Sequence, residues 1–328
     1  MMPESGRGAS AGRPANDERM RDEHPAVVLQ DLEGRRRPAA HIVAFANEKG
    51  GVGKSTFAFH CAVALTHSGM KVLVVDCDRR QQSLHHFLEA RDGTARALRV
   101  PLPRPSHVVL DKQSGALLLQ EIERVGRDCD YVLIDLAGQD SPIARRAIAL
   151  ADTVVTPINC SPTDLDALGR INAVTRRFRN PGPFAEMVTA LRSERVARGH
   201  TGFDWVVATN RVRHCEHRLI AAVEANLATL ARHLGFRTIQ GLTERIAYRE
   251  LLPFGLTQLD LKMIPELGAA RSTNLRELRQ MVEDLRLPCF SPRGRFPVAA
   301  RLNAAVTERT ARNYREAMTA AITLRDTV

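Results

Sequence analysis

The feature that most constrains this chain is a glycine-rich loop at residues 47–56, with the sequence NEKGGVGKST. An apolar run at 41–46 precedes it and predicts a buried strand, and an apolar-rich stretch at 57–67 follows with helical character. A strand, a glycine-rich loop and a helix in this order form an anion site, because loop N–H groups and the helix N-terminus converge on a phosphate. The sequence therefore predicts that this loop binds the phosphates of a nucleotide.

The residues of the loop have different predicted roles. Lys54 can reach the β- and γ-phosphates, and the Ser55 hydroxyl can bind Mg²⁺. Glu48 stands where the usual pattern has glycine, and Lys49 is an additional lysine. The alternative is a glycine-rich turn with incidental lysines. The predicted nucleotide-binding residues of the loop are Lys49, Gly50, Gly51, Val52, Gly53, Lys54, Ser55 and Thr56.

Acidic residues follow two further predicted strands. The run 71–76 ends at Asp76, with Asp78 two residues later, and the run 130–135 ends at Asp135. Carboxylates at the C-terminal ends of parallel strands lie where ligands bind in doubly wound sheets. Asp76 or Asp78 can position a water or a metal-bound water, unless both only cap the next helix. Asp135 matches a Walker B acid and is predicted to hold Mg²⁺ through a water.

Two more residues are candidates for nucleotide binding. Gly138 lies in the turn after Asp135, where its N–H could contact the γ-phosphate and report its presence. Asn210 ends the predicted strand 204–210, where its amide could read an adenine ring, with a simple turn role as the alternative.

The order of the predicted elements indicates an α/β P-loop fold, with a mostly parallel twisted sheet and helices on both faces. A further strand is predicted at 152–158, and residues 93–115 are expected to be irregular. Ser141 is a predicted helix N-cap, and a capping pattern at Ser161 predicts a helix running to about Arg179. The other predicted helices cover 116–127, 216–234 and 272–286.

The formal charge of +10 is unevenly distributed. Residues 170–250 hold 14 arginines against seven acidic residues. Such a concentration favours a polyanionic partner, and a solvated helical surface is the alternative. The candidate residues for contact with a polyanion, which the family resemblance given below implies to be DNA, are Arg211, Arg213, Arg218, Arg232, Arg237 and Arg245.

The expected domain plan has three parts. Residues 1–38 are predicted to be a disordered arm, 39–287 the nucleotide-binding domain, and 288–328 a basic extension in which 298–324 can form one helix. That helix could pack, bind a partner or lie on a membrane, although it has few bulky apolar residues for the last role. Six scattered cysteines and the lack of long apolar runs lead us to expect a soluble protein of the cytoplasm.

With these residues in place, the chain resembles the deviant Walker A ATPases of the ParA and MinD type. The resemblance rests on residues 49–56, on the strand end at Asp76 and Asp78, and on Asp135. Within that superfamily the chain is most similar to the MipZ family of division-plane positioning ATPases. The stretch 244–257, with the sequence ERIAYRELLPFGLT, is the most specific part of that similarity.

The resemblance implies a slow ATPase that acts as a nucleotide-switched homodimer with ATP and Mg²⁺. Lys49 of one subunit would reach the phosphates bound by the other, Asp78 would position the attacking water, and Asp135 and Ser55 would hold Mg²⁺. The ATP-bound dimer would bind DNA nonspecifically, inhibit polymerisation of the tubulin-like protein FtsZ, and be recruited by the centromere-binding protein ParB. Leu136 and Ala137 stand where the family commonly has Thr-Pro after the Walker B acid. The behaviour of the nucleotide switch at this position is therefore expected to differ from that of the family.

Two other functions fit the same residues. A ParA-type partition ATPase would move chromosomes or plasmids without affecting division. A metabolic P-loop ligase or kinase would show substrate-dependent ATP use without dimer-linked DNA binding.

Overall fold

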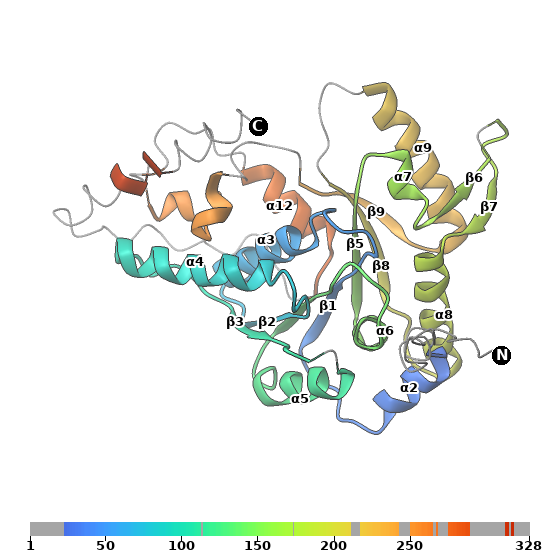
Figure 1. Cartoon of the computed structure of the whole chain (residues 1–328), viewed down its shortest axis with the longest axis horizontal. Coiled ribbons are helices and arrows are strands. Elements are labelled where there is room, and N and C mark those ends of the chain that lie inside the picture. Colours follow the sequence, from blue (N-terminus) through green and yellow to red (C-terminus); the bar gives the residue numbers. More distant parts are fainter. Residues whose placement is uncertain are drawn as a thin grey trace, which may run out of the picture.

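Seven parallel strands form the central sheet of the computed structural model (Figure 1), which describes residues 23–112, 114–172, 174–210, 217–242, 250–264, 267, 275–288, 312–314 and 316–317. The strand order is β3-β2-β4-β1-β5-β8-β9, and every pairing is parallel. The strands are β1 (His41–Phe45), β2 (Val72–Asp76), β3 (Ser106–Val109), β4 (Tyr131–Asp135), β5 (Thr153–Asn159), β8 (Asp204–Asn210) and β9 (Arg237–Gln240).

Helices cover both faces of this sheet, as Figure 1 shows. One face packs against α3 (Lys54–His67), α4 (Ser83–Leu98) and α12 (Leu275–Asp284). The other packs against α2 (Pro25–Glu33), α5 (Gly115–Val125), α6 (Pro142–Leu150), α8 (Pro183–Ala197) and α9 (His217–Leu234). The predicted α/β fold class is therefore confirmed.

The central strand β1 shows why the strands are almost wholly apolar. Ile42 and Ala44 belong to the core on one face, and Val43 and Phe45 belong to the core on the other. A parallel strand covered by helices on both sides has no solvent-facing positions, so its sequence is a continuous apolar run. The register pairs Asp135 with both Phe45 and Asp76. The loops that follow β1, β2 and β4 consequently meet at one edge of the sheet.

The helix predicted from Ser161 to about Arg179 is wrong. Only α7 (Pro162–Leu165) is helical, and a hairpin of β6 (Gly169–Ile171) and β7 (Phe178–Pro181) follows. The Asn172 side chain accepts hydrogen bonds from the backbone N–H groups of Val174 and Thr175, at 2.9 Å each, and reverses the chain. A side-chain-capped turn competes effectively with a helix of weak periodicity.

Residues 93–115 are also more regular than expected. α4 continues to Leu98, and β3 pairs in parallel with β2 at the edge of the sheet. The prolines at 101, 103 and 105 fall between these two elements, so they interrupt neither. Helix α8 and strand β9 were not predicted.

The expected disorder of residues 1–38 does not extend over its second half, where α2 lies beside α6 and α8. Val28 and Leu29 of α2 are buried in the core. Arg146 of α6 pairs with Glu23 and Asp31, and Arg198 hydrogen-bonds Glu33 at 2.9 Å. The helix is held by two apolar residues and by a few ion pairs with distant arginines. No local sequence pattern indicates these contacts. The predicted disorder of residues 1–22 lies outside the described residues.

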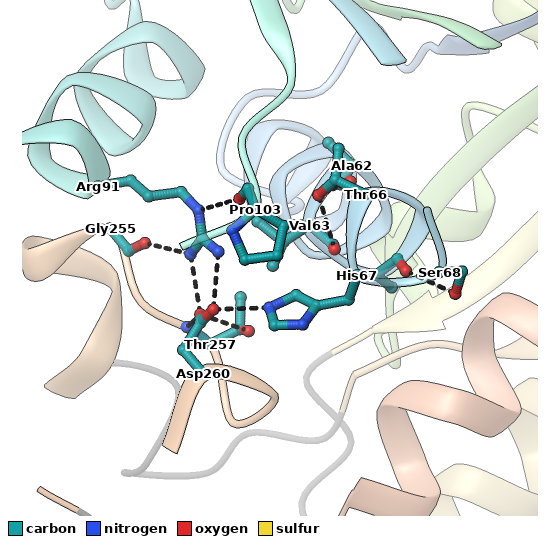
Figure 2. A network of polar contacts seen from close by, with 11 residues as sticks. Ala62, Val63, Thr66, His67, Ser68, Arg91, Pro103, Gly255, Thr257 and Asp260 are labelled. Atoms are coloured by element: carbon teal, nitrogen blue, oxygen red, sulfur yellow. Dashed lines mark hydrogen bonds and ion pairs between the residues drawn. The ribbon is translucent and has the colours of Figure 1, made fainter. Parts of the chain in front are cut away.

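A buried polar network joins the C-terminal part of the domain to α3 and α4 (Figure 2). Asp260 accepts hydrogen bonds from both terminal nitrogens of Arg91, at 2.7 and 2.8 Å, and from the Thr257 hydroxyl and N–H. His67 Nε2 lies 2.7 Å from the same carboxylate. Arg91, His67 and Asp260 are almost fully buried.

The described part of the stretch 244–257 takes part in this network. It contains the short 3-10 helix η1 (Leu252–Phe254) and Gly255, whose φ is 61°. A Cβ at Gly255 would overlap with the backbone of Phe87 and Arg91 in α4, so glycine alone permits this close contact. The described part of the stretch, residues 250–257, therefore docks on α4. Residues 243–249 lie outside the described residues.

Of the C-terminal extension, the structure describes Pro288, 312–314 and 316–317, and the last two stretches are helical. The single helix considered for 298–324 stays a prediction. Tyr314 packs against Phe254, with ring centroids 5.3 Å apart. Within the described residues, no helix combines the length and apolar character needed to cross a membrane.

Candidate nucleotide-binding site

The glycine-rich loop lines a cavity of about 420 Å³ at the carboxyl edge of the sheet. Gly51 and Gly53 have φ angles of 74° and 91°, which L side chains rarely adopt. α3 begins directly at Lys54, so its N-terminus lies at the cavity. The cavity residues are Gly50, Gly51, Gly53–Thr56, Asp78–Gln81, Ser83, Phe87 and Ala137–Gln139. A cavity of this size, with backbone N–H groups at a helix N-terminus, suits the phosphates of a nucleotide.

Lys54 brings a largely buried positive charge to this cavity. Its Nζ donates to the carbonyl of Lys49 at 3.2 Å. Burial lowers the pKa of Lys54, and the nearby carboxylates Asp135 and Asp78 oppose that shift. A bound phosphate would restore the favourable environment of the ammonium group.

Asp135 is buried beneath the cavity, and its environment suits a divalent cation. Burial raises its pKa to about 8, Asp76 adds to the rise, and Ser55 and Lys54 oppose it. Apart from the Ser55 hydroxyl beside it, the carboxylate has no hydrogen-bond partner among the described residues. An oxygen donor of this kind beside the Ser55 hydroxyl is the donor set that Mg²⁺ takes, so these two residues fit the predicted metal.

Asp76 and Asp78 organise the loop after β2. Asp76 accepts backbone N–H groups from Asp78 and His85 at 2.9 and 3.0 Å, and burial raises its pKa. Asp78 lines the cavity and accepts the N–H groups of Arg80 and Gln81 at 3.1 Å each. Asp76 is thus a buried support, while Asp78 is placed where it can face a ligand.

The additional lysine, Lys49, points toward α7. Its ammonium group pairs with the buried carboxylate of Asp164 and lies 3.3 Å from the Thr163 hydroxyl. Asp164 also accepts the backbone N–H of Asn159 at 2.9 Å. The sequence placed Asp164 only in a capping pattern, and no local signal connects it with Lys49. The Lys49 side chain itself remains 43% exposed, unlike that of Lys54.

Gly138 and Asn210 both lie against the loop. A Cβ at Gly138 would stand 3.2 Å from the N of Gly50, so this position faces the loop, and the contact of its N–H with the γ-phosphate stays a prediction. Asn210 is buried, and its Nδ2 donates to the Val52 carbonyl at 3.0 Å. This contact makes Asn210 a structural support of the loop, and its predicted contact with an adenine ring stays a prediction.

Comparison of the chain with known proteins identifies its family. The family model of the ATPase MipZ matches residues 41–289, which is most of the chain. The chain belongs to the MipZ ATPase family. Thus the resemblance drawn from the loop and from residues 244–257 is confirmed.

More distant relatives are partition proteins. The chain is 28% identical over 161 residues to the chromosome-partitioning ATPase Soj of Thermus thermophilus, covering 44% of this chain and 64% of Soj. It is 25% identical over 168 residues to the chromosome partitioning protein ParA of Caulobacter vibrioides, covering 42% and 63%. The match spans less than two thirds of these relatives. Cyanothece apo McdA has the same fold, with a TM-score of 0.52 at 20% identity, covering 76% of this chain and 100% of McdA.

One residue of the MipZ-family site was missed by sequence reasoning. Asn47 is buried, donates from Nδ2 to the Pro157 carbonyl at 2.8 Å, and accepts the N–H of Lys49 at 2.9 Å. It therefore fixes the start of the loop against β5. Its place as the first residue of the loop is the signal that could have identified it.

The predicted DNA-binding arginines are only partly described. Arg232 is exposed on the last turn of α9. Arg237 instead pairs with Asp204 at 2.7 Å and donates to the Leu285 carbonyl at 2.7 Å, at the sheet edge opposite the loop. Its guanidinium is committed to holding β8, β9 and the end of α12, which argues against a DNA contact. The side chains of Arg211, Arg213, Arg218 and Arg245 lie outside the described residues.

The β6–β7 hairpin presents other arginines of the basic segment. Four of them are exposed within a few residues of one another: Arg170, Arg176, Arg177 and Arg179. The hairpin projects beside α9 in Figure 1, and Arg176 hydrogen-bonds Asn226 of that helix at 3.3 Å. Sequence reasoning assigned this region to a helix, so it did not single out these arginines.

Proposed function

We propose that this MipZ-family chain is an ATP-dependent dimerising switch that positions the division plane. In this proposal it inhibits FtsZ polymerisation, binds DNA nonspecifically and is recruited by a ParB-like centromere-binding protein. The observation that carries the proposal is the match of the MipZ family over residues 41–289, which includes the specific stretch docked on α4. It would act in the cytoplasm on the nucleoid, graded from the cell poles.

The residues of the cavity account for ATP binding and slow hydrolysis. Lys54 and the N–H groups of the loop would hold the phosphates, and Asp78 would orient the attacking water. Ser55 and Asp135 would hold Mg²⁺, which supplies positive charge at the phosphates when bound. The developing charge of the transition state needs a further cation, as phosphoryl-transfer sites commonly have.

Lys49 is the candidate for that further cation. Its half-exposed ammonium group pairs with Asp164, and the same exposure makes it available to a second copy of the chain. In the ATP-bound dimer Lys49 would exchange Asp164 for the phosphates of the partner. Lys49→Ala should bind ATP as a monomer and fail to dimerise, as measured by light scattering with ATP. A variant that still dimerises normally would refute the role in trans.

DNA binding would use exposed arginines of the segment 170–250. The four on the β6–β7 hairpin support this part of the proposal because they lie together on a projecting element. Binding should require ATP and fall steeply with salt, because arginine–phosphate contacts release counterions. DNA retention measured with ATP, ADP and no nucleotide at two salt concentrations tests this expectation. Equal retention in all three states would exclude the switch.

The hairpin also allows a matched comparison. Replacing Arg176 and Arg177 by glutamine should weaken DNA retention and reduce its salt dependence by about one counterion per lost phosphate contact. Arg124→Gln, on α5 outside the basic segment, is the control and should bind as the unmodified protein does.

A ParA-type partition ATPase is the second candidate, favoured by the similarity to Soj and ParA. Sedimentation of FtsZ filaments with the ATP-loaded protein distinguishes the two. Fewer filaments support division control, whereas unchanged filaments favour partition.

A further inference from the structure

Three side chains with metal-ligand chemistry lie together where α4 packs against β3. His85 and Glu89 are one helical turn apart on α4, and His107 lies on the edge strand β3. One ligand atom from each of the three lies within 4.8 Å of the others. His107 Nε2 is 3.4 Å from Glu89 Oε1, and the two imidazole rings have centroids 5.2 Å apart.

An ion pair explains only part of this cluster. It accounts for His107 and Glu89, but it leaves His85 aside. Nδ1 of His85 is buried and has no hydrogen-bond partner among the described residues. A buried imidazole nitrogen without a partner is costly, and coordination of a metal ion by this nitrogen would satisfy it.

We propose that His85, Glu89 and His107 bind a divalent transition-metal ion, with Zn²⁺ as the best match. Two imidazole nitrogens and one carboxylate oxygen form a borderline donor set that suits Zn²⁺ far better than Mg²⁺ or Ca²⁺. Three protein ligands leave a fourth position for water. The three residues are not among those that line the nucleotide cavity, so this site is separate from the Mg²⁺ site at Asp135.

The ion would act as a clamp between two elements. β3 is an edge strand with only β2 beside it, and α4 packs over that edge. A metal held from both elements ties them together and stabilises only the folded chain. The clamp also lies close to the loop after β2 that contains Asp78, because the backbone N–H of His85 donates to Asp76 at 3.0 Å.

Zn²⁺ binding to the full chain tests the proposal, by equilibrium dialysis with excess Mg²⁺ to occupy the cavity site. We expect one Zn²⁺ per chain at this site and a raised unfolding temperature. His107→Gln or Glu89→Gln should weaken Zn²⁺ binding by at least about tenfold, since loss of even an outer-shell partner costs about 10- to 100-fold. His86→Gln is the matched control: His86 is the exposed neighbour of His85 and lies outside the cluster.

Co²⁺ gives a second readout that does not depend on the variants. Bound at this site, it should show the visible absorption of a four-coordinate ion with nitrogen and oxygen ligands, without a sulfur charge-transfer band. Circular dichroism of the metal-free variants establishes that they fold. The proposal is overturned if the unmodified protein binds no Zn²⁺, if Co²⁺ shows thiolate ligation, or if His86→Gln loses as much affinity as His107→Gln.

Discussion

At the scale of single residues, the glycine-rich loop contains a position where a Cβ atom would not fit. Gly53 has a positive φ, and a Cβ there would overlap with Nδ2 of Asn210. Asn210 in turn holds the loop through Val52. The glycine pattern of the sequence is thus explained by a close contact with a strand end more than 150 residues later, as well as by space for phosphate.

Gly53→Ala should weaken ATP binding by at least about tenfold, because the clash displaces the loop from its phosphate-binding geometry, at a cost of about 1.4 kcal/mol or more. Gly69→Ala is a matched control, since Gly69 has a similar φ of 83° but no atom near the position of a Cβ. The control should lose about 1 kcal/mol of stability and retain its affinity for ATP. Isothermal titration with ATP measures the difference, and equal losses of affinity would contradict the explanation.

The pair of Lys49 and Asp164 allows a separate measurement on the monomer. Lys49 is half-exposed and Asp164 is buried, so we expect a modest coupling of about 1 kcal/mol. Urea unfolding of Lys49→Ala, Asp164→Asn and the double variant gives this coupling from a double-mutant cycle. Strictly additive effects would show that the pair contributes nothing to the monomer.

At the scale of elements, the network around Asp260 attaches the C-terminal segment to α3 and α4. Its charges are buried and mutually satisfied, an arrangement in which removal of one partner is costly. Asp260→Asn should lower the free energy of unfolding by about 3 kcal/mol, because Arg91 is left as an unpaired buried charge. Asp92→Asn, next to Arg91 but in a more exposed pair with Arg104, should cost less than about 1 kcal/mol.

The same carboxylate predicts a dependence of stability on pH. Arg91 and His67 hold the pKa of Asp260 far below its usual value, against the opposing effect of its burial. A lowered folded-state pKa gives stability that is complete above the unfolded pKa of about 3.9 and is lost as the pH falls below it. Urea unfolding between pH 5 and about pH 3 should show a steeper loss for the unmodified protein than for Asp260→Asn. Parallel curves would contradict this assignment.

The sequence predicted the elements that carry their own pattern. Strands such as β1 and β4 are continuous apolar runs, and Ser141 caps α6 with its side chain as expected. The failures have two physical causes: contacts with distant residues, and a local side-chain turn that competes with a helix. Helix α2 depends on Arg146 and Arg198, and the turn at Asn172 overrides the helical pattern after Ser161.

In the candidate site, too, local patterns were predictable and contacts between distant residues were not. The glycines, Lys54, Ser55 and Asp78 are recognisable from their spacing, and the structure brings them to one cavity. The partnership of Lys49 with Asp164 and the contact of Asn210 with Val52 join residues more than 110 positions apart. No single-sequence pattern encodes such pairs, so their roles became visible only in the fold.

At the scale of the whole molecule, the proposed switch is a cycle of two copies of the chain. Asp78→Ala should bind ATP and accumulate as a dimer, because hydrolysis no longer returns it to the monomer. Size-exclusion chromatography with light scattering measures the dimer fraction over time. If nucleotide binding is lost instead, Asp78 is a binding residue.

Asp78→Asn refines that comparison. Asn keeps an oxygen that can accept the N–H groups of Arg80 and Gln81, so the turn is retained while the carboxylate is lost. Both variants should trap the dimer if the charge of Asp78 matters, and only Asp78→Ala should do so if the turn matters.

The close contact of Gly255 with α4 limits which amino-acid substitutions the chain can tolerate. The carbonyl of Phe87 lies directly under Gly255, while Phe87 is also one of the residues around the nucleotide cavity. A larger residue at 255 would displace α4 and thereby change the wall of the nucleotide cavity, although Gly255 and Phe87 are 168 positions apart in the chain. Substitutions in the docked stretch and in the cavity wall are therefore expected to be epistatic. A library that varies residues 250–257 and 83–91 together should recover active pairs whose single members are inactive.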